Sequence, residues 1–518
     1  MYIVTSAEMQ AMDRMTIERF GIPGRVLMEN AGREAARVFR AHFPATVGGT
    51  VGVLAGRGNN GGDGHVIARC LAASGYPVTV FLLGTADRVI GDAAANLRLL
   101  SALGIPLIEV PDEGAFDRNA PRMRATGVWV DAVFGIGLRD AVGGIYRKAI
   151  DFVNGAGRPV FSVDMPSGLD ADTGLPLGAC IRARVTVTFG FPKIGLMVHP
   201  GAELAGTVEV VDIGIPDAVA DAVAPRQRLL TPDDVRRMLP ARPADAHKGR
   251  TGHLLVVGGS SGKTGAAAMT ATAALRVGAG RVTVGTAAAL NPVMETLVLE
   301  AMTAPLADHG TGRLGPAALE ELAELGRGKS CLAVGPGLGM APGTGELVRA
   351  LVRSADAPLV VDADGLNHLA GHLETLEGLR VPVVLTPHPG EMARLMATDA
   401  AAVQRDRLGC ARRLATGRGV HVVLKGARTI VAHPDGSLFL NPTGNPGMAA
   451  GGMGDVLTGA IAGLICQGIP PVEAALAGVY LHGAAADRLA ATVGPCGYLA
   501  GEVMRELPAA MARVVQGG

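Results

Sequence analysis

The residue types best suited to chemistry lie in one glycine-dense stretch, which runs from Thr443 to Asp455. An apolar run at 456–464 follows at once and predicts a buried helix. A glycine loop that leads into a helix presents unpaired backbone N–H groups and the positive end of the helix dipole. This pattern predicts an anion site at which Asp455 could take a proton from a neighbouring hydroxyl. The alternative is that Asp455 only caps the helix, but the density of glycines favours the anion site.

A second set of polar residues follows three predicted strands in the N-terminal half. These strands end near Ala55, Phe134 and Val163, and each one leads into a loop of glycine and polar residues. The carboxyl ends of parallel strands meet at one edge of a sheet, so the three loops are expected to form one ligand site. Their glycines would let the backbone approach a diphosphate closely.

Five side chains of this half are candidates for metal binding or catalysis. Oxygen atoms of Asn60, Asp131 and Ser167 would suit a hard monovalent or divalent cation. For Asp131 alone, a helix or turn cap is an equally good interpretation. Asp164 is the preferred acid or base because it ends a strand. Lys193 is either a charged substrate contact or a solvated surface lysine.

Regular alternation of strands and helices positions these residues. Runs with helical spacing lie between the predicted strands, beginning with a helix that we expect Ser6 to cap. The alternation predicts an α/β fold class, with a parallel sheet between layers of helices in each half. The composition changes between residues 215 and 249. We therefore place a domain boundary near residue 225, which gives domains 1–224 and 225–518.

One nucleotide-binding motif is nearly complete in the second half. Gly262-Lys263-Thr264 matches the end of a Walker A loop, but Val257 stands where the first glycine should be. We therefore do not expect a P-loop in this segment.

The composition argues against several classes of protein. Lys and Arg together number 47, and so do Asp and Glu, so the zero net charge gives no electrostatic case for binding nucleic acid or a membrane surface. The six cysteines form no C-x-x-C pair, which argues against zinc and against a disulfide framework. We find no signal peptide and no membrane helix in the sequence. We expect a cytoplasmic protein whose alanine-rich helices could pair subunits in a homo-oligomer.

Three motifs of the N-terminal half carry a family resemblance, namely Asn59-Asn60-Gly61-Gly62-Asp63-Gly64, Asp131-Ala132-Val133-Phe134-Gly135-Ile136-Gly137 and Val163-Asp164-Met165-Pro166-Ser167-Gly168. Over roughly residues 1–215 the sequence resembles the NAD(P)H-hydrate epimerase family, which has a Rossmann-like fold. The resemblance implies that the hydrated dinucleotide is bound by Asn59, Asn60, Gly61, Gly62, Asp63, Gly135, Ile136, Gly137, Leu138, Arg139, Asp140 and Ala141. It also implies potassium on Asn60, Asp131 and Ser167, with substrate contacts from Asp164 and Tyr146.

The motifs of the C-terminal half lie at 335–339, 362–364, 386–391, 425–429 and 451–455. They resemble the ADP-dependent NAD(P)H-hydrate dehydratase family, which has a ribokinase-like fold. The resemblance implies that ADP is the co-substrate and is bound by Lys425, Gly426, Ala427, Arg428, Thr429 and Gly454. It implies that Ala267, Gly337, His388 and the catalytic Asp455 face the hydrate. The two halves together resemble a fused repair enzyme.

The expected chemistry fits this combination. A hydrated nicotinamide ring carries a hydroxyl at C6, which is a poor leaving group, and phosphoryl transfer onto that hydroxyl would ease its departure. Backbone N–H groups and Mg²⁺ would steady the phosphates while Asp455 takes the hydroxyl proton. By the resemblance, the dehydratase accepts only the S epimer, which explains the attached epimerase.

Two other functions are open to this sequence. The second half could be a true small-molecule kinase, because the same loop would serve phosphorylation, but a vitamin or sugar kinase has no use for an epimerase-like half. The N-terminal half could instead be a non-catalytic binding module. That alternative predicts loss of the polar strand ends, which this sequence keeps.

Overall fold

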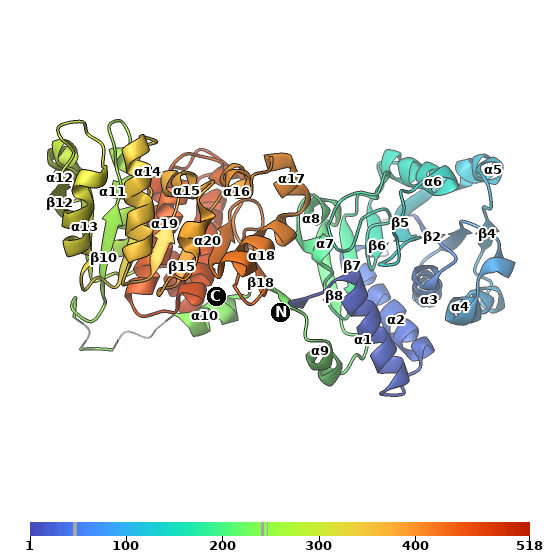
Figure 1. Cartoon of the computed structure of the whole chain (residues 1–518). Coiled ribbons are helices and arrows are strands. Elements are labelled where there is room, and N and C mark those ends of the chain that lie inside the picture. The colour runs from blue at the N-terminus through green and yellow to red at the C-terminus, as the bar shows by residue number, and fades with distance from the viewer. Residues whose placement is uncertain (45–48, 240–242, 246, 518) are drawn as a thin grey trace. The chain divides into compact units, whose positions relative to one another are not determined.

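The structure, a computed structural model, describes residues 1–44, 49–239, 243–245 and 247–517 and divides the chain into two compact units (Figure 1). One unit spans residues 2–225, and the other spans residues 226–518 together with Met1. Each contains a largely parallel sheet covered by helices, which confirms the predicted α/β class. The functional roles of the two predicted domains stay predictions at this point. None of the helices in the described ranges combines the length and the apolar composition that a membrane crossing requires.

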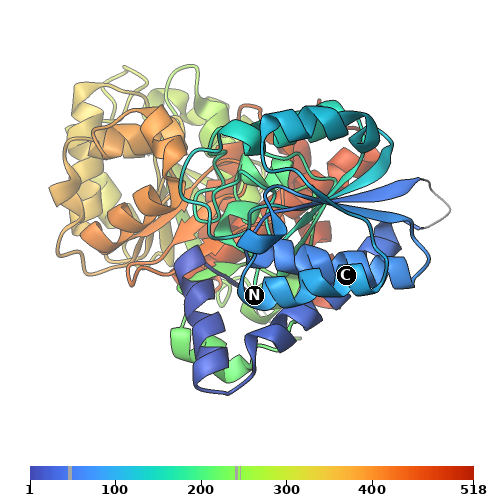
Figure 2. The ribbon, with the colours of Figure 1, turned by 90° about the vertical axis from the view of Figure 1, so that its right-hand side faces the viewer.

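The N-terminal sheet is parallel throughout, with the strand order β4-β3-β2-β5-β6-β7-β8. Its strands are β2 (Thr50–Ala55), β3 (Val78–Leu82), β4 (Leu107–Glu109), β5 (Thr126–Ala132), β6 (Val160–Val163), β7 (Val185–Phe189) and β8 (Thr207–Val211). Its helices are α1 (Ser6–Glu18), α2 (Gly24–His42), α3 (Asn59–Ala73), α4 (Gly91–Ala102), α5 (Glu113–Met123), α6 (Gly144–Gly155), α7 (Ile194–Met197), α8 (Gly201–Leu204) and α9 (Asp217–Val223). Figure 2 shows helices on both faces of this sheet, which explains why β3 and β6 are buried at every position.

The C-terminal sheet has the strand order β9-β18-β17-β16-β15-β14-β13-β10-β11-β12. Its strands are β9 (Gln227–Leu229), β10 (His253–Val257), β11 (Arg281–Ala287), β12 (Met302–Leu306), β13 (Cys331–Val334), β14 (Leu359–Val361), β15 (Val383–Leu385), β16 (His421–Leu424), β17 (Ile430–Ala432) and β18 (Leu438–Leu440). The pairings are parallel except those of β17, which is antiparallel to both of its neighbours. Its helices are α10 (Pro232–Met238), α11 (Thr264–Arg276), α12 (Asn291–Leu297), α13 (Leu319–Gly326), α14 (Pro342–Ser354), α15 (Asp364–Leu369), α16 (Pro389–Leu395), α17 (Ala400–Arg405), α18 (Arg407–Arg418), α19 (Met453–Cys466), α20 (Pro471–Thr492) and α21 (Ala500–Gln516).

Small residues let α11 and α19 pack closely in the C-terminal unit. A Cβ on Gly459 would lie 2.1 Å from the Thr270 carbonyl oxygen, and one on Gly463 would lie 2.7 Å from Cα of Ala274. The close approach lets Thr270 Oγ1 donate a hydrogen bond to the Asp455 carbonyl oxygen at 3.0 Å. The packing of the two helices therefore fixes the position of the first turn of α19.

Substitution of Gly459 by alanine is expected to destabilise the C-terminal unit by about 1–3 kcal/mol, because the added methyl group has no space. Gly417→Ala in α18 is the matched control, since a Cβ there meets no atom within 4 Å. Alanine is the better helix former, so the control is expected to be neutral or stabilising. Chemical denaturation followed by circular dichroism measures both changes. An unchanged unfolding midpoint for Gly459→Ala would contradict the close packing.

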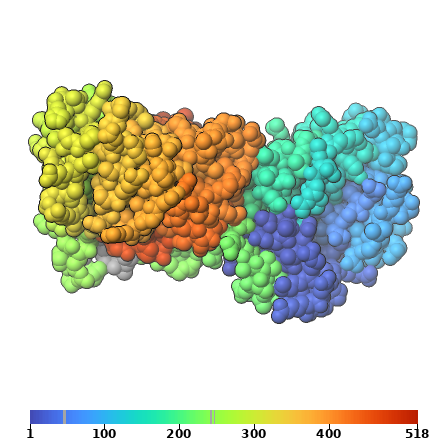
Figure 3. All heavy atoms as spheres, viewed as in Figure 1, coloured from blue at the N-terminus to red at the C-terminus, as the bar shows by residue number. Residues whose placement is uncertain are grey.

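The start of the first helix differs from the prediction. Thr5, not Ser6, is the N-cap, because Thr5 Oγ1 accepts a hydrogen bond from the Glu8 N–H at 3.1 Å and the Glu8 carboxylate accepts one from the Thr5 N–H. Ser6 instead donates its hydroxyl to Asp172, a partner far away in the sequence. Figure 3 shows α1 and α2 at the surface of the N-terminal unit, so one side of α1 faces solvent while the other packs inward.

Candidate active sites

A cavity of about 800 Å³ lies at the carboxyl ends of β2, β5 and β6 in the N-terminal unit. The predicted site residues that line it are Asn59, Asn60, Asp63, Gly135, Ile136, Gly137, Leu138, Arg139, Asp140, Tyr146 and Asp164. The predicted residues Gly61, Gly62, Asp131, Ala141 and Ser167 do not line it. The fold thus brings the three polar strand ends together at one edge of the sheet, as parallel strands require.

Gly61 and Gly62 have a packing role in the first turn of α3. A Cβ on Gly61 would lie 2.0 Å from the Gly56 carbonyl oxygen, and one on Gly62 would lie 2.7 Å from Cε of Met28. Both residues are buried. They let α3 begin directly against the end of β2, which places Asn60 at the cavity.

Asp131 joins the ends of β5 and β6. Its carboxylate accepts hydrogen bonds from Ser162 Oγ at 2.9 Å, the Ser167 N–H at 2.8 Å and Ser167 Oγ at 2.5 Å. Burial raises the pKa of Asp131, while these hydrogen bonds oppose the shift. The residue therefore anchors the turn after β6, and it does not cap a helix.

The side-chain amide of Asn60 is buried, and neither of its polar atoms has a hydrogen-bond partner in the described part of the chain. A Cβ on Gly135 would lie 3.3 Å from Asn60 Oδ1 and 3.2 Å from Asp164 Oδ2, so these atoms converge on one point. A buried amide without a partner is costly. The amide oxygen therefore fits a bound ion or ligand, such as the potassium expected on Asn60, Asp131 and Ser167.

Asp164 and Lys193 form a buried ion pair in the wall of the cavity. Lys193 Nζ lies 2.6 Å from Asp164 Oδ1 and also donates to Thr188 Oγ1 at 3.0 Å and to the Phe189 carbonyl oxygen at 2.9 Å. The lysine side chain is only 1% exposed, so its interpretation as a solvated surface residue is wrong. Asp164 has φ +64°, a left-handed conformation that is rare for residues other than glycine. Such conformations concentrate at functional sites.

Two further carboxyl groups face this pair. Burial raises the pKa of Asp63 well above its ordinary value, and the nearby Asp164 and Asp13 raise it further. Asp13 of α1, which the sequence analysis did not select, also lines the cavity. Asp13 follows the buried Met9 by four residues, so both lie on the same side of α1. A carboxylate on the apolar side of a helix is the sequence signal that could have identified it.

In the C-terminal unit, Asp455 lies in the first turn of α19, whose N-cap is Gly452. Within the described ranges no N–H donates a hydrogen bond to its carboxylate, so the helix-cap alternative is wrong. Burial raises the pKa of Asp455 to about 7, with a further contribution from Asp362, while Lys425 opposes the shift. At neutral pH this carboxyl group is therefore poised to exchange a proton.

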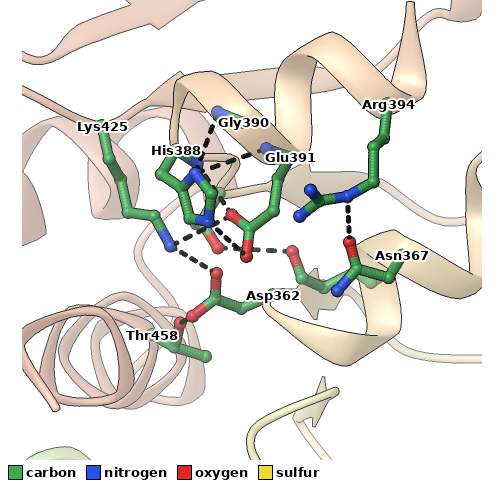
Figure 4. Close-up of polar contacts among 10 residues, drawn as sticks. Asp362, Asn367, His388, Gly390, Glu391, Arg394, Lys425 and Thr458 are labelled. Carbon is green, nitrogen blue, oxygen red and sulfur yellow. Dashed lines mark hydrogen bonds and ion pairs between the residues drawn. The ribbon is translucent and has the colours of Figure 1, made fainter. Parts of the chain in front are cut away.

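Lys425 and Asp362 form the centre of a polar network (Figure 4). Both residues interact electrostatically with Asp455. Lys425 Nζ lies 2.7 Å from Asp362 Oδ1 and 3.7 Å from Glu391 Oε2. Thr458 Oγ1 of α19 donates to Asp362 Oδ2 at 2.7 Å. Burial lowers the pKa of Lys425, but Asp362 and Glu391 outweigh burial and raise it overall. The lysine is thus a fixed cation near the start of α19.

His388 has a structural role, whatever ligand it contacts. It is the N-cap of α16, and its Nδ1 accepts hydrogen bonds from the Gly390 N–H at 3.0 Å and the Glu391 N–H at 3.3 Å. Its Nε2 lies 3.3 Å from Glu391 Oε1, and its side chain is half exposed (Figure 4). The predicted contact with the hydrate stays a prediction.

The predicted nucleotide segment, 425–429, is held by a residue that sequence analysis missed. Arg407 of α18 donates from Nη1 to the Ala427 carbonyl oxygen and from Nη2, at 3.3 Å, to the carbonyl oxygens of Leu424 and Lys425. Gly426 has φ +131°, and a Cβ there would lie 3.0 Å from Arg407 Nη2. Further contacts of the segment run from Arg428 Nη1 to the Pro442 carbonyl oxygen and from Thr429 Oγ1 to the Gly426 carbonyl oxygen.

The remaining predicted residues of this half lie in two places. Gly454 adjoins the lysine, since a Cβ on it would lie 3.2 Å from Lys425 Nζ. Gly337 packs against the start of α11, where a Cβ on it would lie 2.4 Å from the Lys263 carbonyl oxygen. Ala267 is fully buried in the same helix. That these two places share one ligand stays a prediction.

Comparison with known proteins identifies the family. A family profile described as NAD(P)H-hydrate dehydratase matches residues 254–509. A second profile, described as YjeF-related protein N-terminus, matches residues 24–195. A bifunctional NAD(P)H-hydrate repair enzyme Nnr from Moorella thermoacetica is 45% identical over 98% of this chain and 96% of its own length. The chain belongs to the family of bifunctional NAD(P)H-hydrate repair enzymes. The resemblance found in both halves of the sequence is thereby confirmed.

One further relative matches nearly the whole chain, and a solved structure matches about half of it. The Salinibacter ruber enzyme of the same name is 41% identical over 98% of this chain and 95% of its own. A solved structure of an ADP/ATP-dependent NAD(P)H-hydrate dehydratase from Bacillus subtilis, co-crystallised with ATP and Mg²⁺, is 34% identical. It covers 55% of this chain and 98% of its own, with a TM-score of 0.48.

Proposed function

We propose that the N-terminal unit interconverts the R and S hydrates of NADH and NADPH and that the C-terminal unit dehydrates the S hydrate. The second reaction consumes ADP and releases AMP and phosphate. The observation that carries this proposal is the similarity to bifunctional repair enzymes over 98% of the chain, which includes both candidate sites.

For the dehydration, the chain must bind ADP next to the C6 hydroxyl of the hydrate. We assign ADP binding to Lys425, Gly426, Ala427, Arg428, Thr429 and Gly454, and contact with the hydrate to Ala267, Gly337 and His388. Asp455 takes the hydroxyl proton as the phosphoryl group is transferred to the oxygen. The ring regains its C5–C6 double bond when phosphate leaves C6 and C5 gives up a proton.

For the epimerisation, Asp164 is the proposed acid or base, and we assign binding of the dinucleotide to residues 59–63 and 135–141 and to Tyr146. Potassium on Asn60, Asp131 and Ser167 would supply a fixed positive charge, and the unpartnered amide of Asn60 supports that position. Within the described residues no cluster of three or more His, Cys, Asp or Glu side chains could hold a metal ion. Mg²⁺ is therefore proposed to arrive on the ADP phosphates, whose charge it offsets.

We further propose that the protein acts on these small molecules in the cytoplasm, as a homo-oligomer. Light scattering on the purified protein gives the oligomeric state directly. A mass equal to the 52.7 kDa chain would exclude the oligomer.

The proposed function is tested by mixing purified protein with both epimers of NADH hydrate, ADP, Mg²⁺ and K⁺ and following the dihydronicotinamide absorbance. The wild type is expected to recover the whole pool and to recover none without a nucleotide. Asp164→Asn is expected to recover only the S share promptly, because the R share then depends on spontaneous epimerisation. No recovery with ADP or ATP would overturn the dehydratase assignment and favour a small-molecule kinase.

A further inference from the structure

Asp13 is a charged residue of the N-terminal cavity that the proposed reaction has not yet used. It lies on α1, lines the same cavity as Asp164 and Lys193, and is only half-buried. In the part of the chain that the structure describes, no group donates a hydrogen bond to its carboxylate. A carboxyl group that is partly withdrawn from water and left unpaired next to an ion pair is free to contact a ligand in the cavity.

The fold holds Asp13 in a fixed position. The start of α1 is bound to the loop before α7, since the Val4 N–H donates to the Pro192 carbonyl oxygen and the Ile194 N–H donates to the Val4 carbonyl oxygen, each at 3.0 Å. Lys193 lies between those two residues. The main-chain segment that carries Lys193 therefore also anchors the helix that carries Asp13.

The charged groups around Asp13 come from several elements. Asp63 of α3, Asp164 after β6 and Lys193 before α7 interact with it electrostatically, and Arg57, Asp92, Arg139 and Asp140 also line the cavity. Burial raises the pKa of Asp13 to about 6, with Lys193 opposing and Asp164 adding to the shift. Near neutral pH the group therefore exchanges between its protonated and ionised forms, which suits proton transfer.

Inversion at C6 needs two proton-transferring groups. The C6–O bond breaks with its electron pair on oxygen, which takes a proton from an acid, while the lone pair of the ring nitrogen forms a nitrogen–carbon double bond. Water then attacks C6 from the opposite face, the electron pair returns to nitrogen, and the water gives a proton to a base. The departing water and the added water balance, and the acid and base regain their protonation states through solvent.

We propose that Asp13 is the second catalytic residue of the epimerase site, exchanging a proton with the C6 oxygen on the face of the ring opposite Asp164. Asp164, ion-paired with Lys193, acts on the other face, and the two groups exchange roles when the reaction runs in the reverse direction. This assignment rests on the proposed epimerase function and names a residue that the sequence motifs do not include.

The test compares Asp13→Asn with Glu18→Gln, which makes the same change from carboxyl to amide at an exposed position of the same helix. When ADP is added to a mixture of both hydrates, NADH is recovered in two phases. The fast phase is dehydration of the S hydrate already present, and the rate of the slow phase is that of epimerisation of the R hydrate. Asp13→Asn is expected to slow the second phase by about 100-fold, or to the rate of spontaneous epimerisation where that limit is reached first, and to leave the first phase unchanged. Glu18→Gln is expected to match the wild type in both phases.

The pH dependence gives a second readout. The wild-type rate of epimerisation is expected to show an ionisation near pH 6, which Asp13→Asn should lack. Trp129 is the only tryptophan of the chain and is buried in β5, so its emission reports whether the N-terminal unit is folded. If Asp13→Asn alters that emission, Asp13→Ser takes its place with the same expected loss.

The outcomes separate this inference from the proposed function. If the wild type dehydrates the S hydrate but recovers the R hydrate no faster than spontaneous epimerisation allows, the proposed epimerase function is wrong. If the wild type epimerises the hydrates and a folded Asp13→Asn variant does so at the same rate, Asp13 is not a catalytic residue, while the epimerase function still holds. Loss of epimerisation in the folded variant alone, with Glu18→Gln active, supports the inference.

Discussion

Replacement of Asp455 by asparagine is expected to slow dehydration of the S hydrate by about 10³-fold, because the amide cannot accept the hydroxyl proton. The side chain keeps its shape, so ADP binding is expected to change little. Single-turnover absorbance measurements on the pure S hydrate give the rate of the chemical step. The rate of epimerisation should be unaffected, since Asp455 belongs to the other unit.

Asp356→Asn is the matched control, since Asp356 is an exposed carboxylate of the same unit.

The wild-type rate of dehydration should also depend on pH in a definite direction. A base must be ionised, and the pKa of Asp455 is about 7. The rate is therefore expected to rise about tenfold per pH unit below pH 7 and to level off above it. A rate that is flat across this range, or an Asp455→Asn variant with more than about a tenth of wild-type activity, would contradict the role as base.

Replacement of Lys193 by methionine is expected to abolish epimerisation and to destabilise the N-terminal unit by about 3–5 kcal/mol. The variant leaves the Asp164 carboxylate buried without its counter-ion. Denaturant unfolding followed by Trp129 emission measures the free energy of unfolding of this unit. Lys148→Met is the control, because Lys148 and Asp117 form an exposed pair in the same unit that is expected to be worth less than about 1 kcal/mol.

A double variant separates stability from catalysis. Lys193→Met combined with Asp164→Asn removes both charges, and asparagine tolerates the left-handed backbone of position 164. Most of the lost stability is expected to return, since a buried pair contributes little net stability compared with its neutral replacement. Epimerisation should stay absent. If the double variant is as unstable as Lys193→Met, the unpaired charge is not the cause of the instability.

Much of the fold followed from local sequence patterns. Apolar runs that end in turn residues predicted β2, β5 and β6, the strands that lead into the three loops of the N-terminal site. The cap of α1 was assigned to the wrong residue, because Thr5 and Ser6 can both cap and only the long-range contact of Ser6 with Asp172 decides between them. Neighbouring residues with equal local propensity cannot be separated without that contact.

The sequence by itself determined the α/β class, the family and the loops that meet at each site, because glycine spacing, strand period and loop chemistry are local properties of the chain. Tertiary structure alone decided the charge environment. It buried Lys193 against Asp164, brought Asp13 of α1 into the cavity, and placed Arg407 behind the nucleotide segment. Each of these contacts joins residues from separate elements, and burial then sets the ionisation of the groups. Sequence spacing carries no information about either.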